Sequence, residues 1–458
     1  MSEFPARPTF SARLGYGMGD FGFLLLWHGS SLFLLYVYTD VLGINPAVAG
    51  AIYLAAMIWD AVSDPLVASW SERQAMRTGR YSPIIAKAAL PLGLAYALIY
   101  FAPPLSGWSL AAWVLITHLA FRTAYTIASM PYNTLPIRLA RSGRDRSALS
   151  GARVAGAALG ALTTAIITPV LVQSLQAQGQ SEQMGYQIAA LIIGGLAALF
   201  LLACTRLVRE GKTGEPMPPS ASYSESIRAM FLAAAGNGPL IRLLLIMIGA
   251  TLAQGFFLQN VLYYLTHVLN RADMITPVLA VSAFSVILGA PVWVWVATRT
   301  SKKSSLVYGM FLASAGYLLM ALAPMAGNFI PLVSASIASI GGAAIPVMLW
   351  SMMPDAIEHG EVETGVRIEA RTFGLAAFCQ KTTVGLGAVI IGGVLSLSGY
   401  DPESTLPPSA VTALTLMIAW LPALIMSGLT FIIRTYPIDE ARHCEILAVL
   451  DERKKRGV

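Results

Sequence analysis

The sequence contains very little charge for its length, and this scarcity excludes a soluble globular protein. Only 12% of the 458 residues are charged, whereas 56% are hydrophobic and the mean hydropathy is +0.65. A soluble domain of similar size carries roughly a quarter charged residues. So few polar side chains cannot cover a soluble surface, and we therefore expect an integral membrane protein.

Cysteines and catalytic motifs are also scarce. Cys204, Cys379 and Cys444 are an odd and widely spaced set, which forms neither a disulfide framework nor the ligand spacing of a metal site. The sequence has no HExxH motif, no catalytic-type cysteine–histidine arrangement and no Walker phosphate loop. We therefore predict no enzymatic activity, no ATP drive, no cofactor, and no metal beyond a coupling ion.

Long hydrophobic segments account for most of the chain. A membrane-spanning helix needs about 20 mostly apolar residues. The first such segment is too long for the core of a signal peptide and is predicted to be a membrane helix. Twelve candidate spans lie at 16–41, 46–68, 83–102, 108–131, 149–172, 186–207, 240–265, 274–297, 304–325, 330–353, 371–397 and 409–433.

A polar stretch at 208–239 divides these spans into six and six. Two six-helix halves joined by a polar linker are typical of the major facilitator fold, in which an axis along the membrane normal relates the halves. The predicted fold class is therefore all-α, with twelve transmembrane helices in two six-helix bundles. We expect an N-terminal bundle at 1–207, a cytoplasmic linker at 208–239, a C-terminal bundle at 240–433 and a cytoplasmic tail at 434–458.

The distribution of basic residues predicts the orientation. Arginine and lysine gather in the loops after even-numbered spans, in the linker and in the tail, whereas the opposite loops contain only Arg271. The positive-inside rule places the basic loops in the cytoplasm. Both termini are thus expected to be cytoplasmic, in a multi-pass protein of the bacterial inner membrane.

Two carboxylates lie within the second span, in IWDAVSDP. Asp60 and Asp64 are four residues apart and occupy one helical face. Carboxylates this close share a proton unless a cation lies between them, as a coupling site for Na⁺, Li⁺ or H⁺ requires. Ser63 could add an oxygen ligand. The alternative is a gate or salt-bridge pair at the cytoplasmic end of the helix, without a cation.

Two basic residues also lie at membrane depth. Arg122 forms a polar stripe with Thr126 and Ser129 on the fourth span, and Lys381 lies in the middle of the eleventh. A buried cation needs an anionic partner. For Arg122 the candidates are the aspartate pair or an acidic group on the solute, and for Lys381 the candidate is Asp60. A purely structural ion pair is the alternative for both.

Weaker candidates lie elsewhere. Asp20 is near the cytoplasmic end of the first span, and Arg153 is just inside the fifth. His28, beside Trp27, could face a cavity and stack on a sugar ring, although a lone membrane histidine is more often a hydrogen-bonded packing residue. Trp27 is a candidate solute contact.

Several motifs together resemble the glycoside–pentoside–hexuronide:cation symporters, the melibiose permease family. In chain order they are YGMGD, the aspartate pair, GRYSP, MPYNTL and PDAIEHGEVETGVRIEARTFGLAAFCQK. The last motif is long and specific, and the resemblance covers nearly the whole chain. It implies cation-coupled sugar symport by alternating access on the major facilitator fold.

The resemblance also implies residue roles. Asp60, Asp64, Ser63 and Thr126 match the cation site, Lys381 a lysine close to it, and Arg153 an arginine of the sugar site. With the residues argued above, the candidate substrate-binding set is Arg122, Ser129, Arg153, Trp27 and Lys381. The candidate cytoplasmic gate is Asp20, Arg80, Asp355, Glu358, Glu361 and Arg367.

Two departures from the melibiose permease bear on the solute. Leu24 and Ser129 stand where that permease has acidic sugar ligands, and Ser63 replaces an asparagine beside the cation. Melibiose is therefore not the expected solute, and Na⁺ and H⁺ both stay open as coupling ions. Arg122 makes an anionic solute such as a uronide worth testing, because arginine binds a carboxylate bidentately.

Two other functions are consistent with the sequence. The transported solute could be a lysolipid-like amphiphile, or the protein could be a membrane sensor that binds a solute without moving it. The absence of a sizeable soluble output domain disfavours the sensor. The expected partners are a small polar solute (a sugar, glycoside or uronide) and the lipid bilayer, with no nucleic acid, and a monomer is expected.

Overall fold

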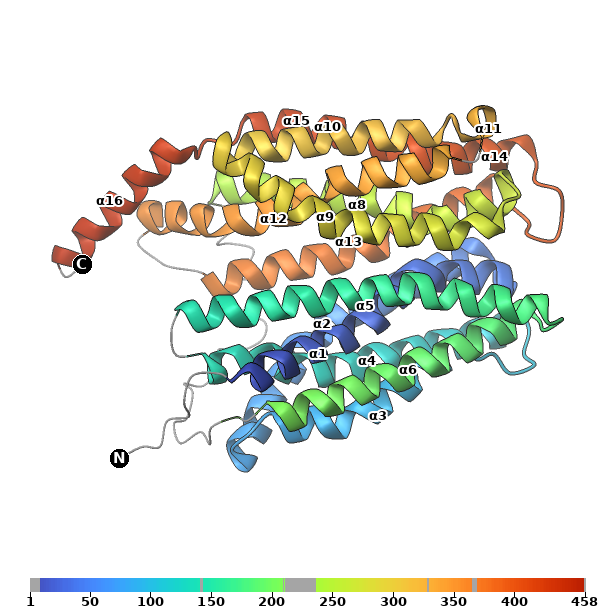
Figure 1. The fold of residues 1–458 in the computed structure, drawn as a ribbon, viewed down its shortest axis with the longest axis horizontal. Coiled ribbons are helices and arrows are strands. Elements are labelled where there is room, and N and C mark those ends of the chain that lie inside the picture. Colours follow the sequence, from blue (N-terminus) through green and yellow to red (C-terminus); the bar gives the residue numbers. More distant parts are fainter. Residues whose placement is uncertain are drawn as a thin grey trace. The chain divides into compact units, whose positions relative to one another are not determined.

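The computed structural model describes residues 9–140, 143–208, 210, 236–327, 329–364 and 369–456. In this part of the chain every regular element is helical (Figure 1). Up to residue 207 the α-helices are α1 (Phe10–Tyr36), α2 (Pro46–Thr78), α3 (Ser82–Leu98), α4 (Gly107–Leu139), α5 (Gly143–Ala177) and α6 (Glu182–Leu207). The later ones are α8 (Gly238–Tyr263), α9 (Ile275–Arg299), α10 (Lys302–Met320), α11 (Ala323–Ala326), α12 (Ile330–Thr364), α13 (Glu369–Leu397), α14 (Pro408–Thr415), α15 (Leu421–Arg434) and α16 (Glu440–Arg456).

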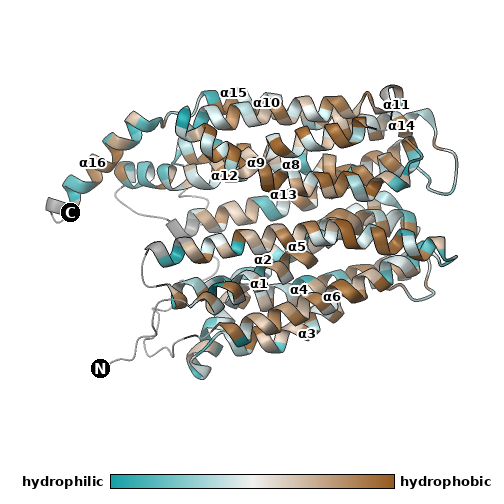
Figure 2. Ribbon diagram, viewed as in Figure 1, coloured by the Kyte–Doolittle hydropathy of each residue, from teal (hydrophilic) through white to brown (hydrophobic). Residues whose placement is uncertain are grey.

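The predicted spans are confirmed as helices. Ten helices in the described residues are long and apolar enough to cross a membrane, and α3 and α10 occupy the other two predicted positions. The last span, Pro408–Arg434, joins α14 to α15 through a π-helical turn at Leu416–Trp420. Figure 2 shows hydrophobic residues along these helices and hydrophilic residues in α16. The chain is a multi-pass membrane protein.

Three helices extend beyond the spans read from hydropathy. α2 continues to Thr78, α4 to Leu139 and α12 to Thr364, whereas the apolar segments end at 68, 131 and 353. A hydropathy profile stops where charged residues begin, but a helix stops where its backbone is capped. In α2 the cap is Gly79, whose φ of 75° suits glycine because it has no Cβ.

The chain forms two compact units. The first comprises 1–220 and 388–405, and the second comprises 221–387 and 406–458. Within the first unit α1 packs on α5 and α6, α2 on α4, and α3 on α6. Within the second, α12 packs on α9 and α10, and α15 on α8 and α10. The predicted linker is described only at 208, 210 and 236–239, and the predicted domain boundaries stay a prediction.

Glycines let α1 and α5 approach closely. A Cβ added to Gly17 would lie 2.7 Å from the carbonyl oxygen of Ala152, and one added to Gly160 would lie 2.5 Å from that of Phe21. A Cβ on Gly156 would overlap the carbonyl group of Gly17. Small residues serve this purpose in membrane helices, where association depends on close packing.

We expect Gly156→Ala to destabilise the protein, because the added methyl group has no space against the backbone of α1. Overpacking costs about 1–3 kcal/mol. Gly151→Ala is the matched control, since it lies on the same helix and its added Cβ would meet nothing within 4 Å. Thermal unfolding in detergent should show a lower Tm for Gly156→Ala only. Equal Tm values for the two variants would contradict this packing.

Candidate cation and solute site

Two carboxylates converge on one hydroxyl group between α2 and α4. Thr126 Oγ1 lies 3.0 Å from Asp60 Oδ1 and 3.1 Å from Asp64 Oδ1. Asp60 is fully buried, as is Thr126. A hydroxyl group has a single proton and cannot donate to both carboxylates at once. The geometry therefore concentrates negative charge at one buried point, where a cation or a proton would relieve the repulsion.

Local packing holds this cluster in place. Asp60 and Asp64 share a face of α2, and that helix packs on α4. Trp59 Nε1 also donates a hydrogen bond to Thr123 Oγ1 at 2.9 Å, so a second contact fixes the register of α2 and α4. The Ser63 hydroxyl donates to the carbonyl oxygen of Asp60 at 3.1 Å. The lone pairs of the Ser63 hydroxyl oxygen stay available, and the role of Ser63 as a cation ligand stays a prediction.

We expect Thr126→Val to weaken binding of the coupling cation, because valine keeps the shape but removes the oxygen between the two carboxylates. The cation concentration at half-saturation should rise about tenfold, which corresponds to about 1.4 kcal/mol. Thr134→Val is the control on the same helix, because the Thr134 hydroxyl donates to the carbonyl oxygen of Pro131 in α4 itself. An unchanged cation requirement in Thr126→Val would exclude this hydroxyl from the site.

Arg122 is fully buried one helical turn before Thr126, in aromatic surroundings. The guanidinium carbon lies 4.9 Å from the ring centre of Trp27 and 5.3 Å from that of Phe121. Nε donates to His118 Nε2 at 3.4 Å, and His118 Nδ1 lies 3.3 Å from the Tyr38 hydroxyl oxygen. Since Nε2 accepts, the proton of the neutral ring belongs on Nδ1. The neighbours of Arg122 in the described residues thus include aromatic rings, an imidazole and the Tyr53 hydroxyl.

Asp20 and Arg153 form an ion pair between α1 and α5. Arg153 Nε lies 3.3 Å from Asp20 Oδ1, and the side chain of Asp20 is 6% exposed whereas that of Arg153 is 44% exposed. The Arg153 guanidinium carbon also lies 6.0 Å from the ring centre of Tyr132. The sequence predicts a gate role for Asp20 and a solute contact for Arg153. The structure brings them together, and both roles stay predictions.

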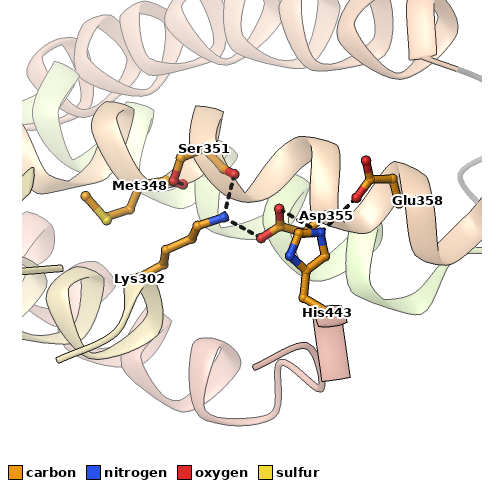
Figure 3. A network of polar contacts seen from close by, with 6 residues as sticks. All are labelled: Lys302, Met348, Ser351, Asp355, Glu358 and His443. Carbon is orange, nitrogen blue, oxygen red and sulfur yellow. Dashed lines mark hydrogen bonds and ion pairs between the residues drawn. The ribbon is translucent and has the colours of Figure 1, made fainter. Parts of the chain in front are cut away.

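A second polar cluster lies on α12 in the second unit. Asp355 Oδ2 accepts from Lys302 Nζ at 2.7 Å, and Lys302 also donates to the carbonyl oxygen of Ser351 at 3.1 Å. His443 Nε2 of α16 lies 2.8 Å from Glu358 Oε2 and 3.6 Å from Asp355 Oδ1. Figure 3 shows the lysine and the histidine approaching the two carboxylates. We call Lys302, Asp355, Glu358 and His443 the α12 ion cluster.

The remaining predicted residues have separate places. Ser129 is buried on α4, Arg80 is exposed after α2, and Lys381 is half-buried on α13. The carbonyl oxygen of Glu361 accepts from Arg453 at 3.4 Å. Arg367 lies outside the described residues.

Sequence reasoning missed Lys302, His443 and Glu210. Glu210, from the predicted linker, is buried and accepts hydrogen bonds from the backbone N–H groups of Tyr81 and Ser82 at 2.8 and 2.6 Å. These groups are at the start of α3, where a carboxylate interacts favourably with the helix dipole. Lys302 could have been found as part of a basic loop, but no local signal marks His443.

Comparisons with known proteins agree on a transporter. The uncharacterized symporter YnaJ of Bacillus subtilis (strain 168) is 26% identical over 99% of this chain and 97% of its own length. The glucuronide carrier protein homolog of Escherichia coli (strain K12) is 27% identical over 96% of this chain and 95% of its own. A solved structure of a mutant nucleoside transporter NupG superposes with a TM-score of 0.65 at 14% identity, covering 92% of this chain and 99% of NupG.

The solved structure supports the fold alone, namely the major facilitator fold predicted from the six-plus-six pattern. The resemblance to the glycoside–pentoside–hexuronide:cation symporters is confirmed by the curated relatives together with the family model, which is described as MFS/sugar transport protein. The family and these relatives are transporters and not enzymes. Because the family model matches residues 15–440, which is nearly the whole sequence, the chain belongs to the MFS/sugar transport protein family.

Proposed function

We propose that the protein is a secondary active transporter that couples the movement of Na⁺ or H⁺ to the symport of a sugar, glycoside or uronide by alternating access. The observation that carries this proposal is the convergence of Asp60 and Asp64 on Thr126 Oγ1. Two carboxylates at membrane depth, of which Asp60 is fully buried and Asp64 half-buried, are costly unless positive charge compensates them. A bound coupling ion would supply that positive charge, and Asp60, Asp64, Thr126 and Ser63 are the residues that would hold it.

The relatives support symport of a sugar derivative. One of them is named a symporter and another a glucuronide carrier homolog. We assign solute contact to Arg122, Ser129, Arg153, Trp27 and Lys381. The Asp20–Arg153 pair fits a role in which Arg153 changes partner between Asp20 and solute during the transport cycle.

The α12 ion cluster would act as part of a cytoplasmic gate. Lys302 begins α10, and the other three residues lie on α12 and α16, next to loops that the positive-inside rule places in the cytoplasm. This orientation puts both termini in the cytoplasm of a bacterium, with the protein in the inner membrane. Ion pairs that form and break at such a position would close and open the inward mouth.

Uptake into sealed proteoliposomes tests the proposal. We would offer a labelled glucoside, glucuronide, xyloside and lysophospholipid under separate Na⁺ and H⁺ gradients. We expect one sugar derivative to accumulate above its external concentration with one of the two gradients, and to leak back when an ionophore collapses that gradient. Transport of the lysophospholipid alone would favour an amphiphile carrier, and binding without flux would favour a sensor.

A further inference from the structure

The terminal nitrogens of Arg122 have unused hydrogen-bonding capacity at a buried position. Arg122 is fully buried, and neither Nη1 nor Nη2 makes a hydrogen bond of regular geometry among the residues that the structure describes, although the Tyr53 hydroxyl lies near enough to interact with the guanidinium. A guanidinium group is always charged and carries five N–H donors. Leaving a buried charge unsatisfied costs several kcal/mol. The N–H groups on Nη1 and Nη2 therefore favour an acceptor supplied by a bound molecule.

The surroundings of Arg122 restrict the shape of that acceptor. The rings of Trp27 and Phe121 lie within 4.9 and 5.3 Å of the guanidinium carbon, and His118 takes the Nε donor. With Nε occupied, the two terminal nitrogens are left to present their donors together. An acceptor pair with the spacing of a carboxylate or sulfonate satisfies such a fork bidentately, with charge-assisted bonds.

The same residues offer a place for a sugar ring. Trp27 is only partly buried although Arg122 beside it is fully buried, so part of the surface of Trp27 is accessible. Aromatic faces present an apolar surface on which the C–H groups of a sugar can pack. An anionic group on a sugar would therefore meet both requirements at once, the acceptors and the ring.

The position of Arg122 also relates the anion to the cation site. Arg122 and Thr126 are four residues apart on α4 and share a face of that helix, and Thr126 bonds the two aspartates. The negative aspartates partly offset the positive potential of Arg122, because opposite charges that lie close together compensate one another. A coupling cation that neutralises the aspartates would leave more of this positive potential to attract an anionic solute.

We infer that Arg122 is the specificity-determining residue of the solute site and that the transported solute carries a carboxylate or sulfonate group on a sugar. This inference rests on the proposed function, since it names the solute of that transporter. Trp27 then forms the stacking surface, and His118 and Tyr38 hold the guanidinium in place.

Paired solutes that differ in one group test the inference. Methyl β-D-glucuronide, its 6-sulfonate analogue and the neutral methyl β-D-glucoside would compete for solute exchange in proteoliposomes, which needs no gradient. We expect the wild-type protein to prefer at least one anionic analogue over the glucoside by about thirtyfold or more, or about 2 kcal/mol. The anionic analogue that competes more strongly shows whether the site prefers a carboxylate or a sulfonate.

Arg122→Gln should reduce that preference to about threefold or less, because it should weaken binding of the anionic solute and leave binding of the neutral solute unchanged. Arg122→Lys keeps the charge without the fork and should fall between the two. Arg138→Gln is the control on the same helix, because Arg138 lies over Tyr81 and outside this site. If Arg122→Gln fails to fold, the preference of the wild-type protein and that of Arg122→Lys still test the inference.

Two results would overturn the inference: a wild-type preference for the neutral glucoside, or an unchanged selectivity ratio in folded Arg122→Gln or Arg122→Lys. In either case exchange of the glucoside would leave the proposed function intact. Failure of the wild-type protein to transport any sugar would instead contradict the proposed function itself.

Discussion

Asp60→Asn is expected to abolish accumulation of the solute while solute exchange continues. Asparagine preserves the size of the side chain but removes the charge that a cation would neutralise. The Thr126 hydroxyl can still bond to the amide oxygen, so α2 and α4 should stay together. Because one of two carboxylates at the site is lost, gradient-driven uptake should fall about a hundredfold or more, corresponding to about 2.7 kcal/mol.

Uptake and exchange measured in the same vesicles separate coupling from folding. Glu72→Gln is the matched control, since Glu72 lies on the same helix beyond Pro65. This substitution also removes one negative charge. The variant should accumulate solute like the wild-type protein. Accumulation at the wild-type level in Asp60→Asn would remove Asp60 from the coupling site.

Lys302→Glu is expected to have the second-largest effect. The substitution places a third carboxylate against Asp355 and Glu358, where Lys302 Nζ now lies 2.7 Å from Asp355 Oδ2. Like charges brought together in this way cost several kcal/mol, but the side chain of Lys302 is 42% exposed and solvent screens part of the repulsion. Transport should slow about tenfold to a hundredfold, since the gate could no longer close.

The exchanged pair, Lys302→Glu with Asp355→Lys, should recover part of the lost transport because it restores opposite charges. Lys303→Glu is the control, as Lys303 Nζ donates to the carbonyl oxygens of Arg434 and Tyr436 instead of to the cluster. Rates of uptake in matched vesicles provide the comparison. No recovery in the exchanged pair, with both proteins folded, would exclude an electrostatic gate at this position.

The sequence was a good guide to whatever depends on local pattern. Twelve helices could be predicted because an apolar run of sufficient length forms a helix in lipid, where the backbone must satisfy its own hydrogen bonds. The common face of Asp60 and Asp64 follows from helical periodicity alone. The stripe of Arg122, Thr126 and Ser129 follows in the same way.

Pairings between distant residues could not be predicted. Lys302 and His443 are separated from Asp355 by 53 and 88 positions, and Glu210 by 129 from the backbone that it caps. Such contacts depend on how helices pack in space, and no local spacing encodes them. For Arg122 the sequence indicates a charge at membrane depth and leaves the aspartate pair and an acidic group on the solute as candidate partners, but nothing in it marks the contacts with His118 and two aromatic rings.

The most direct test of cation-coupled symport is the current that a solute triggers in proteoliposomes held on an electrode. Glycosides and uronides would be added under a Na⁺ gradient and, separately, under an H⁺ gradient, to the wild-type protein and to Asp60→Asn. For a neutral glycoside the proposed function predicts a current that requires one of the two cations and disappears in Asp60→Asn. A uronide carries a negative charge that a single cation would cancel, so for it the prediction is cation-dependent accumulation of labelled solute that is lost in the same variant. The absence of both, in vesicles where the protein is folded and binds solute, would contradict the proposed function.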